Sequence, residues 1–429
     1  MNFLFFTPVN EASAIARVSC LVTQELVAQG HHVIVVATDR TPSKLEDRRD
    51  FAAEIVLWSD EGRITRESSQ AHLCIYQIGD SYDFHCGAVK WLSELPGVVC
   101  LHDFYVAHLF HSWALEHGDK GRDILRRWYG ESIESRFFEM ARCSDFIEQT
   151  ADVAPLTEWI ASRALAVITH SRWGISRVQA ACAGPIKVIP LPYSTTVTEV
   201  PEMDDEKDEN RLSLLTVGHI NGNKRVASVI RAIARSPSLR RTITYRLVGP
   251  ISPQAVLELS GLANALGVRL LISGAVDDDA LARAFAQADI VSCLRWPSLE
   301  AASASAIEAM LWRKPIIVTD TGFYREIPDA FVEKVSVIDE IPDICAALER
   351  LAKSPSERAS MAERAWLRAT ETYSAENYAR SLVDLAGSLQ RDRPVAAARA
   401  FFANVLEDWK ANPYRRWFDQ TLDLPGQTI

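Results

Sequence analysis

The chain has 429 residues, and its 56 Asp and Glu outnumber its 46 Lys and Arg, which gives a net charge of -10. At roughly 100–200 residues per domain, this length predicts two or three domains, each able to bury its own core. The negative balance argues against a nucleic-acid-binding protein, because the phosphate backbone attracts clustered Lys and Arg. A small anionic ligand is compatible with it, since such a ligand needs only a local positive site.

The cysteines and the apolar runs indicate the cellular setting. The eight cysteines are scattered without a Cys-x-x-Cys pair, which is typical of free thiols in a reducing compartment. The apolar run at the N-terminus ends at Pro8 and has no basic segment before it, so it predicts a strand and no signal peptide. No apolar stretch approaches the ~18 residues of a membrane span. We therefore expect a cytoplasmic protein, with peripheral contact at the inner membrane face left open.

The first half alternates apolar runs with helical segments. The runs are rich in Val and Ile and show no polar alternation, which is typical of strands covered on both faces. A helix is predicted at 11–29, ending at Gly30, and a mostly helical insert at about 104–163. Strands are predicted at 2–7, 32–38, 53–58, 73–79, 97–103, 165–171 and 186–192. Together they predict a Rossmann-like parallel sheet over 1–195.

An acidic stretch at 196–211 predicts a solvated linker, after which the alternation begins again. Strands are predicted at 212–218, 243–249, 268–274, 289–294 and 314–320, with a helix capped by Asp277 or Asp278. Further helices are predicted at 340–353, 355–373, 376–390 and 395–411. The predicted fold class is α/β, with a second doubly wound domain at 212–375 and closing helices at 376–429. Two such sheets are expected to face one cleft, where ligands bind outside the strand ends.

The segment 294–329 contains the most informative pattern. Glu300 lies in a predicted loop and Glu308 about one turn inside a helix, with small residues including Ser303 and Ala304 between them. A helix N-terminus with small side chains suits a phosphate, and the two carboxylates suit sugar and ribose hydroxyls. The same spacing is compatible with ordinary capping serines and solvated glutamates.

Two other strand ends have polar residues. In 214–234, His219 follows Gly218, and Lys224 opens a predicted helix beside the expected cleft. In 97–110, His102 follows a buried strand, and His85 lies in the preceding helical segment. Each residue alone is also compatible with a structural or surface role.

Together these motifs resemble glycosyltransferase family 4, which has the GT-B fold. The matching segments are Glu300, "AIEAM" (306–310), "KPIIVTD" (314–320) and "GFYREIP" (322–328), together with "LLTVGHINGNK" (214–224) and "GVVCLHD" (97–103). Many relatives have Gly-Phe-Gly where this chain has "AASAS", and Arg where it has His219. The N-terminal loop, "PVNEASAIA" (8–16), lacks the usual glycines.

The resemblance implies a retaining glycosyltransferase that uses a nucleotide-diphosphate sugar. Glu300 and His102 would act on the sugar, while His219, Lys224, Val276, Ser303, Ala304 and Glu308 would bind the donor. His85, Arg225, Ala12 and Ser13 are secondary candidates, with Arg225 as an alternative source of the charge that His219 lacks. No cofactor or metal is implied, and Asp277–Asp279 are read as capping residues.

The resemblance leaves the acceptor open between a glycan and a lipid-linked molecule, with surface polysaccharide or glycoconjugate synthesis as the expected setting. An aromatic and basic face at 126–130, with Phe104, Tyr105, Phe110 and Trp113, would suit a lipid-linked acceptor, but packing of the helical insert is the favoured explanation. The closing helices would cross back and brace the N-terminal domain. Two alternatives stay open: a nucleotide-sugar 2-epimerase, and a non-catalytic partner subunit with the same fold.

Overall fold

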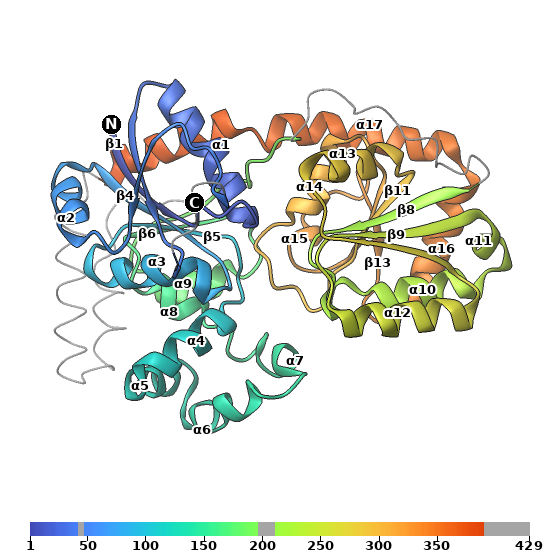
Figure 1. Cartoon of the computed structure of the whole chain (residues 1–429), viewed down its shortest axis with the longest axis horizontal. Helices are drawn as coiled ribbons and strands as arrows, with labels where there is room; N and C mark the ends of the chain where they lie inside the picture. Colours follow the sequence, from blue (N-terminus) through green and yellow to red (C-terminus); the bar gives the residue numbers. More distant parts are fainter. Residues whose placement is uncertain (42–46, 196–210, 390–429) are drawn as a thin grey trace. The chain divides into compact units, whose positions relative to one another are not determined.

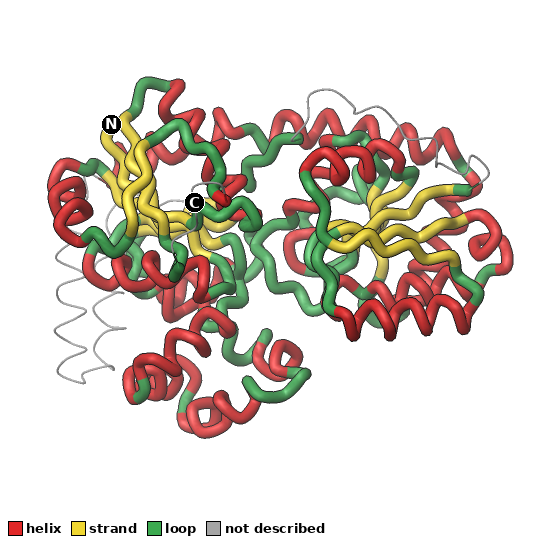
Figure 2. Tube along the Cα trace, viewed as in Figure 1, coloured by secondary structure: helices red, strands yellow, loops and turns green. Residues whose placement is uncertain are grey.

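A computed structural model describes residues 1–41, 47–195 and 211–389. They group into two compact units, which Figures 1 and 2 show. The first contains Met1–His170, Gly174–Ile189 and the segment from Glu376 onward, and the second contains Ser171–Trp173 and Pro190–Ala375. The helix predicted at 395–411 and all of the predicted linker except Arg211 lie outside the described residues. The predicted domain bounds and the bracing role of 376–429 stay predictions.

The first unit is built on one parallel sheet. Its elements in chain order are β1 (Asn2–Thr7), α1 (Ala14–Ala28), β2 (His32–Ala37), β3 (Glu54–Leu57), α2 (Glu61–Gln70), β4 (Leu73–Ile78), α3 (Tyr82–Glu94), β5 (Val98–Leu101), α4 (Ala107–His117), α5 (Asp119–Tyr129), α6 (Glu131–Met140), α7 (Phe146–Thr150), α8 (Thr157–Ala161), β6 (Ala166–Thr169), α9 (Ile175–Ala181) and β7 (Ile186–Val188). Residues 375–389 form a further helix, of which 376–389 belong to this unit.

The strand order of this sheet is β3-β2-β1-β4-β5-β6-β7, and all neighbours pair in parallel. The inner strands β5 and β6 are buried along their whole length, which explains their unbroken apolar sequence. The edge strand β7 is largely exposed. The order reverses between β1 and β4, so the loops after these strands border the crevice where open α/β sheets bind ligands.

The predicted helical insert is present as α4 to α8, of which Figure 1 draws α4 to α7 as a group beside the sheet. Gly118 and Gly130 divide it, because their φ values of 50° and 82° suit glycine and end α4 and α5. Phe104, Tyr105 and Trp113 are all at least nine-tenths buried. Their side chains pack inside the unit, which agrees with the explanation that these aromatic residues pack the helical insert.

The second unit repeats the architecture with six strands. Its elements are β8 (Leu212–Val217), the short 3-10 helix η2 (Gly222–Lys224), α10 (Val226–Arg235), α11 (Pro237–Thr242), β9 (Ile243–Val248), α12 (Pro253–Leu266), β10 (Arg269–Gly274), α13 (Asp278–Gln287), β11 (Ile290–Cys293), α14 (Ala304–Leu311), β12 (Ile316–Thr319), α15 (Gly322–Arg325), β13 (Glu333–Val335), α16 (Glu340–Lys353) and α17 (Pro355–Thr372). Asp277 caps α13 by accepting the Ala280 N–H at 2.7 Å.

This sheet has the order β10-β9-β8-β11-β12-β13, again fully parallel, and reverses between β8 and β11. Figure 1 shows α10 and α12 on one face and α13 and α14 on the other. A hydrophobic core is formed by buried residues from α10, α16 and the strands, including Ile230, Leu247 and Leu348. The predicted α/β fold class with two parallel sheets is confirmed. The edge strand β13 was not predicted, because its three residues include two charged ones.

Two turns at the carboxyl edge of this sheet approach each other closely. Gly218 follows β8 and Gly249 follows β9, and their φ values are 86° and 134°. A Cβ atom on Gly249 would lie 2.4 Å from the carbonyl oxygen of Gly218. Glycine is therefore required at 249 both for its backbone conformation and for this approach.

We predict that Gly249→Ala lowers the free energy of unfolding of the second unit by about 1–3 kcal/mol, because the added methyl group meets backbone. Gly261→Ala is the matched control, since it lies within α12 with nothing within 4 Å of the new atom. The control should stabilise by about 0.5–1 kcal/mol. Denaturant unfolding of both variants measures the difference, and equal midpoints would contradict the requirement.

Candidate functional site

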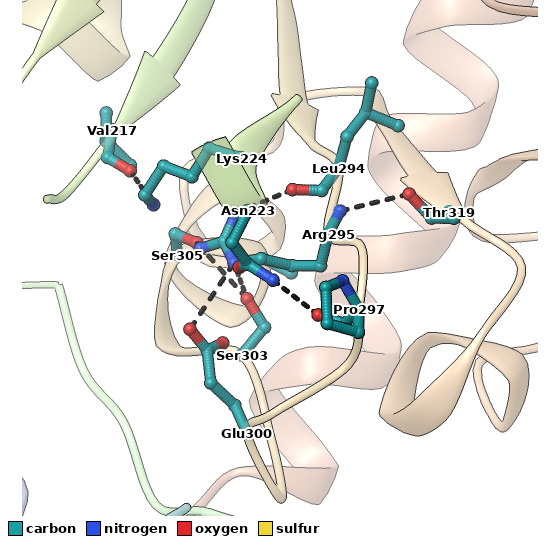
Figure 3. A network of polar contacts seen from close by, with 11 residues as sticks. Val217, Asn223, Lys224, Leu294, Arg295, Pro297, Glu300, Ser303, Ser305 and Thr319 are labelled. Carbon is teal, nitrogen blue, oxygen red and sulfur yellow. Dashed lines mark hydrogen bonds and ion pairs between the residues drawn. The ribbon is translucent and has the colours of Figure 1, made fainter. Parts of the chain in front are cut away.

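The polar candidates of the second unit gather at the carboxyl ends of β8 and β11, the two strands that flank the reversal. Lys224 ends η2, and its Nζ donates to the Val217 carbonyl at 2.5 Å (Figure 3). The side chain is only 6% exposed. Its position follows from the turn after Gly218, because the chain returns over the end of β8 before α10 begins.

The Lys224 ammonium group has an unusual electrostatic environment. Burial and, less strongly, the nearby positive charge of Arg295 lower its pKa to about 7, while the charge of Glu300 acts in the opposite direction. A lysine held this way is protonated only in part at neutral pH in the empty protein. A bound anion would favour its charged form.

The segment after β11 forms the other side of the site. Glu300 lies in the loop before α14, about one-third exposed, and its Oε1 is 3.4 Å from Nε of Arg295. Ser303 caps α14 by accepting the Ala306 N–H at 3.3 Å, and its hydroxyl is 3.2 Å from that of Ser305. Ala304 begins the helix. The structure thus brings Lys224, Glu300, Ser303 and Ala304 to one edge of the sheet, as Figure 3 shows for three of them.

Sequence reasoning missed Arg295. The side chain is 5% exposed and inserts between the strand end and the helix start, donating to the Leu294 carbonyl at 2.8 Å and to Ser305 Oγ at 3.3 Å. Thr319 at the end of β12 accepts its backbone N–H at 3.0 Å. The available signal was an arginine two residues after a buried strand, at the edge where open α/β sheets bind ligands.

Glu308 is buried within α14, with its side chain turned toward the chain segment that precedes the linker. The Tyr193 hydroxyl donates to its Oε2 at 3.1 Å, across 115 residues of sequence. A long-range partner of this kind leaves no signal in a sequence pattern.

The remaining donor candidates of this unit lie outside the Lys224 network. His219 is exposed in the turn after Gly218, and Val276 is 37% exposed in the loop after β10. Arg225, at a φ of 56°, forms a two-pronged ion pair with Glu340, with Nε and Nη2 at 2.6 and 2.7 Å from the carboxylate. The positive charge of Arg225 is therefore paired with the carboxylate of Glu340 at the start of α16.

In the first unit, three histidines lie near the carboxyl ends of β4, β5 and β6. His102 is buried, and its Nε2 is 2.6 Å from the amide oxygen of Gln77. Because that oxygen only accepts, the ring proton lies on Nε2 and Nδ1 remains an acceptor. The His170 ring is 4.9 Å from the His102 ring, centroid to centroid. His85 Nε2 accepts the Gly79 N–H at 3.1 Å.

These histidines are neutral at physiological pH. Burial lowers the pKa of His85 to about 3 and that of His170 to about 4. Burial, with the two neighbouring histidines, holds the pKa of His102 well below its usual value. His85 Nδ1 and His170 Nε2 are buried without a hydrogen-bond partner in the described structure.

The N-terminal loop lies after β1. Ser13 is buried and caps α1 by accepting the Ala16 N–H at 3.3 Å, and Ala12 is exposed. Within the described residues, no group of three His, Cys, Asp or Glu side chains has the arrangement of a metal site. The described helices include none that is long and apolar enough to span a bilayer.

Residues 202–368, which include the whole Lys224 network, match the family model described as Glycosyl transferases group 1. This segment is thus similar to group 1 glycosyltransferase domains. The matched residues include β8, β11 and the loops after them.

A curated relative is the MMP alpha-(1->4)-mannosyltransferase of Mycolicibacterium hassiacum, 26% identical over 267 residues. The similarity covers 61% of this chain and spans 58% of the length of that enzyme.

Solved structures show the same fold. Anabaena HepE, in complex with UDP and glucose, has a TM-score of 0.60 at 15% identity, covering 91% of this chain and 100% of its own. Sucrose-phosphate synthase from Thermosynechococcus elongatus has a TM-score of 0.61 at 15% identity, covering 91% and 99%. WaaG, a glycosyltransferase involved in lipopolysaccharide biosynthesis, has a TM-score of 0.57 at 18% identity, covering 90% and 99%. These neighbours have the GT-B fold.

The lowered pKa of Lys224 predicts a pH-dependent stability. Between about 7 and its usual value of 10.5, the unfolded chain binds a proton that the folded chain lacks. The free energy of unfolding therefore rises with pH over this interval, by up to about 1.4 kcal/mol per pH unit from this group. Lys224→Met should remove this contribution and flatten the rise.

Guanidinium unfolding of both proteins from pH 6.5 to pH 10 measures the effect. Lys353→Met is the matched control, because that lysine is 73% exposed on α16. The control should keep the wild-type slope. A Lys224→Met protein with the wild-type slope would show that Lys224 titrates normally.

Proposed function

We propose that the protein is a retaining glycosyltransferase of the family 4 type. It transfers a hexosyl group from a nucleotide-diphosphate sugar to a glycan or lipid-linked acceptor, in the synthesis of a surface polysaccharide or glycoconjugate. The observation that carries this proposal is the buried Lys224, which lies with Glu300 and the capped start of α14 in a segment similar to group 1 glycosyltransferase domains.

The donor residues have distinct roles in this proposal. The Lys224 ammonium group and the first N–H groups of α14 stabilise the diphosphate as it departs. Glu300 accepts hydrogen bonds from hydroxyls of the transferred sugar, and Glu308 accepts them from the ribose. Val276 lies near the base, and His219 near the phosphates.

The reaction breaks the bond between sugar C1 and the diphosphate oxygen and forms a bond from C1 to an acceptor hydroxyl oxygen. The acceptor proton passes to the departing phosphate oxygen on the same face of the sugar, which retains the anomeric configuration. His102, with Nδ1 as an acceptor, holds a sugar hydroxyl at the reacting face, and the neutral state of its ring suits this role. No metal ion is required in this proposal.

A panel of nucleotide sugars incubated with the pure protein, with and without glycan and lipid-linked acceptors, tests the activity. Transfer or slow hydrolysis of one donor supports the proposal. Conversion of the donor to an epimer without any acceptor would instead indicate a 2-epimerase. Absence of turnover together with absence of nucleoside diphosphate binding would favour a non-catalytic subunit.

We predict that Glu300→Gln lowers kcat/KM for the active donor about 10- to 100-fold, because charge-assisted hydrogen bonds to the sugar are lost. Glu258→Gln is the matched control, since this glutamate is exposed on α12 of the same unit. Its steady-state kinetics should equal those of the wild type. A Glu300→Gln enzyme with unchanged kcat/KM would contradict the role of Glu300.

A further inference from the structure

The carboxyl edge of the second sheet holds two buried cations. Lys224 and Arg295 are 6% and 5% exposed, and the positive charge of Arg295 lowers the pKa of Lys224. The acidic side chain in this network is Glu300, which is partly exposed and 3.4 Å from Arg295 Nε. Burying like charges together is unfavourable, and an anion bound beside them would offset that cost.

We propose that Arg295 supplies the second positive charge of a diphosphate-binding site, at a position of the chain different from the one where the family pattern has arginine. The inference rests on the proposed function, which names a nucleotide-diphosphate sugar as the donor. The ligand is a diphosphate, and Arg295 is a contact residue that the sequence pattern did not indicate.

The local geometry is suited to a phosphate. Arg295 lies two residues after the end of β11, which pairs with β8, so Arg295 and Lys224 follow the two strands that flank the reversal. Its Nη2 donates to Ser305 Oγ in the first turn of α14, and this contact places the guanidinium group beside the unpaired N–H groups of the helix start. Figure 3 shows Arg295 and Lys224 in this network, together with Ser303 and Glu300. A guanidinium group presents several N–H donors in a plane that matches phosphate oxygens.

Arg225 and His219, the other candidate cations of this region, differ from Arg295 in their contacts and exposure. Arg225 is engaged by Glu340, which also accepts from Ser228 Oγ at 2.5 Å. His219 is exposed, and an imidazole has a lower usual pKa than a guanidinium group. Arg295 is therefore the arginine whose burial and contacts are compatible with a role beside Lys224.

Calorimetry on the full chain at fixed ionic strength tests the proposal. UDP, GDP and ADP are titrated first, and the diphosphate that binds the wild type is compared with its nucleoside monophosphate and its nucleoside. Arg295→Gln should weaken diphosphate binding about 10- to 100-fold. It should change nucleoside binding less than about twofold, because the base and ribose contacts remain.

Relocating the charge separates a ligand contact from a purely structural role. Adding His219→Arg to Arg295→Gln should restore diphosphate affinity at least about fivefold, since the arginine then occupies the position of the family pattern. Arg231→Gln is the matched control, because this exposed arginine lies on α10 of the same unit. Its affinity for the diphosphate should equal that of the wild type.

Three results would overturn the inference. One is a folded Arg295→Gln protein that binds the diphosphate as tightly as the wild type. Another is an equal loss of diphosphate and nucleoside binding, with no recovery on adding His219→Arg, because this indicates structural damage alone. If Arg295→Gln does not fold, the Arg295→Lys variant is measured in its place. Weaker diphosphate binding with unchanged nucleoside binding would support the proposal. Unchanged binding of both ligands would refute it.

The wild-type titration separates this inference from the proposed function. A wild type that binds none of the diphosphates overturns the proposed function and the inference with it. A wild type that binds one of them, combined with an Arg295→Gln variant of equal affinity, overturns the inference and leaves the proposed function standing.

Discussion

The central constraint of this molecule is the burial of a lysine ammonium group at the end of a parallel strand. Lys224 is held by the Val217 carbonyl, inside a turn that depends on glycine at 218. The ion pair between Arg225 and Glu340 fixes the next residue of the chain to the start of α16. The turn is thus anchored on both sides, and the site is preorganised: its polar groups are already in place before any ligand arrives. The lowered pKa of Lys224 is the measurable consequence of that arrangement.

Both units have the same sheet topology but different polar residues at the carboxyl ends of their strands. In each sheet the strand order reverses next to the first strand of the unit, and the polar residues described above lie near the carboxyl ends of the strands. The second unit places cationic and acidic groups there. The first places three neutral histidines near its strand ends, with one hydrogen bond from His102 to Gln77. A cationic edge suits a charged leaving group, and a neutral edge of hydrogen-bonding groups suits sugar hydroxyls.

The strands could be predicted well because most are buried on both faces and consist of Val, Ile and Leu. β13 could not, since Glu333 and Lys334 occupy two of its three positions at the sheet edge. Lys224, Glu300 and Ser303 were recognisable from their spacing around strand ends and a helix start. Arg295 was not, because an arginine after a strand is usually a surface residue, and only the fold shows that it is buried. The Tyr193–Glu308 contact likewise depends on a tertiary approach that no local pattern encodes.

The neutral histidines have a consequence for the whole first unit. In the unfolded chain each ring takes up a proton near its ordinary pKa of about 6.5. In the fold, His85 and His170 do so only near 3 and 4. Below about pH 6.5 the unfolded chain therefore binds protons that the folded unit does not, so stability falls as the solution becomes more acidic. Near pH 6 these rings can take up protons only after the unit unfolds, and acid therefore promotes its unfolding.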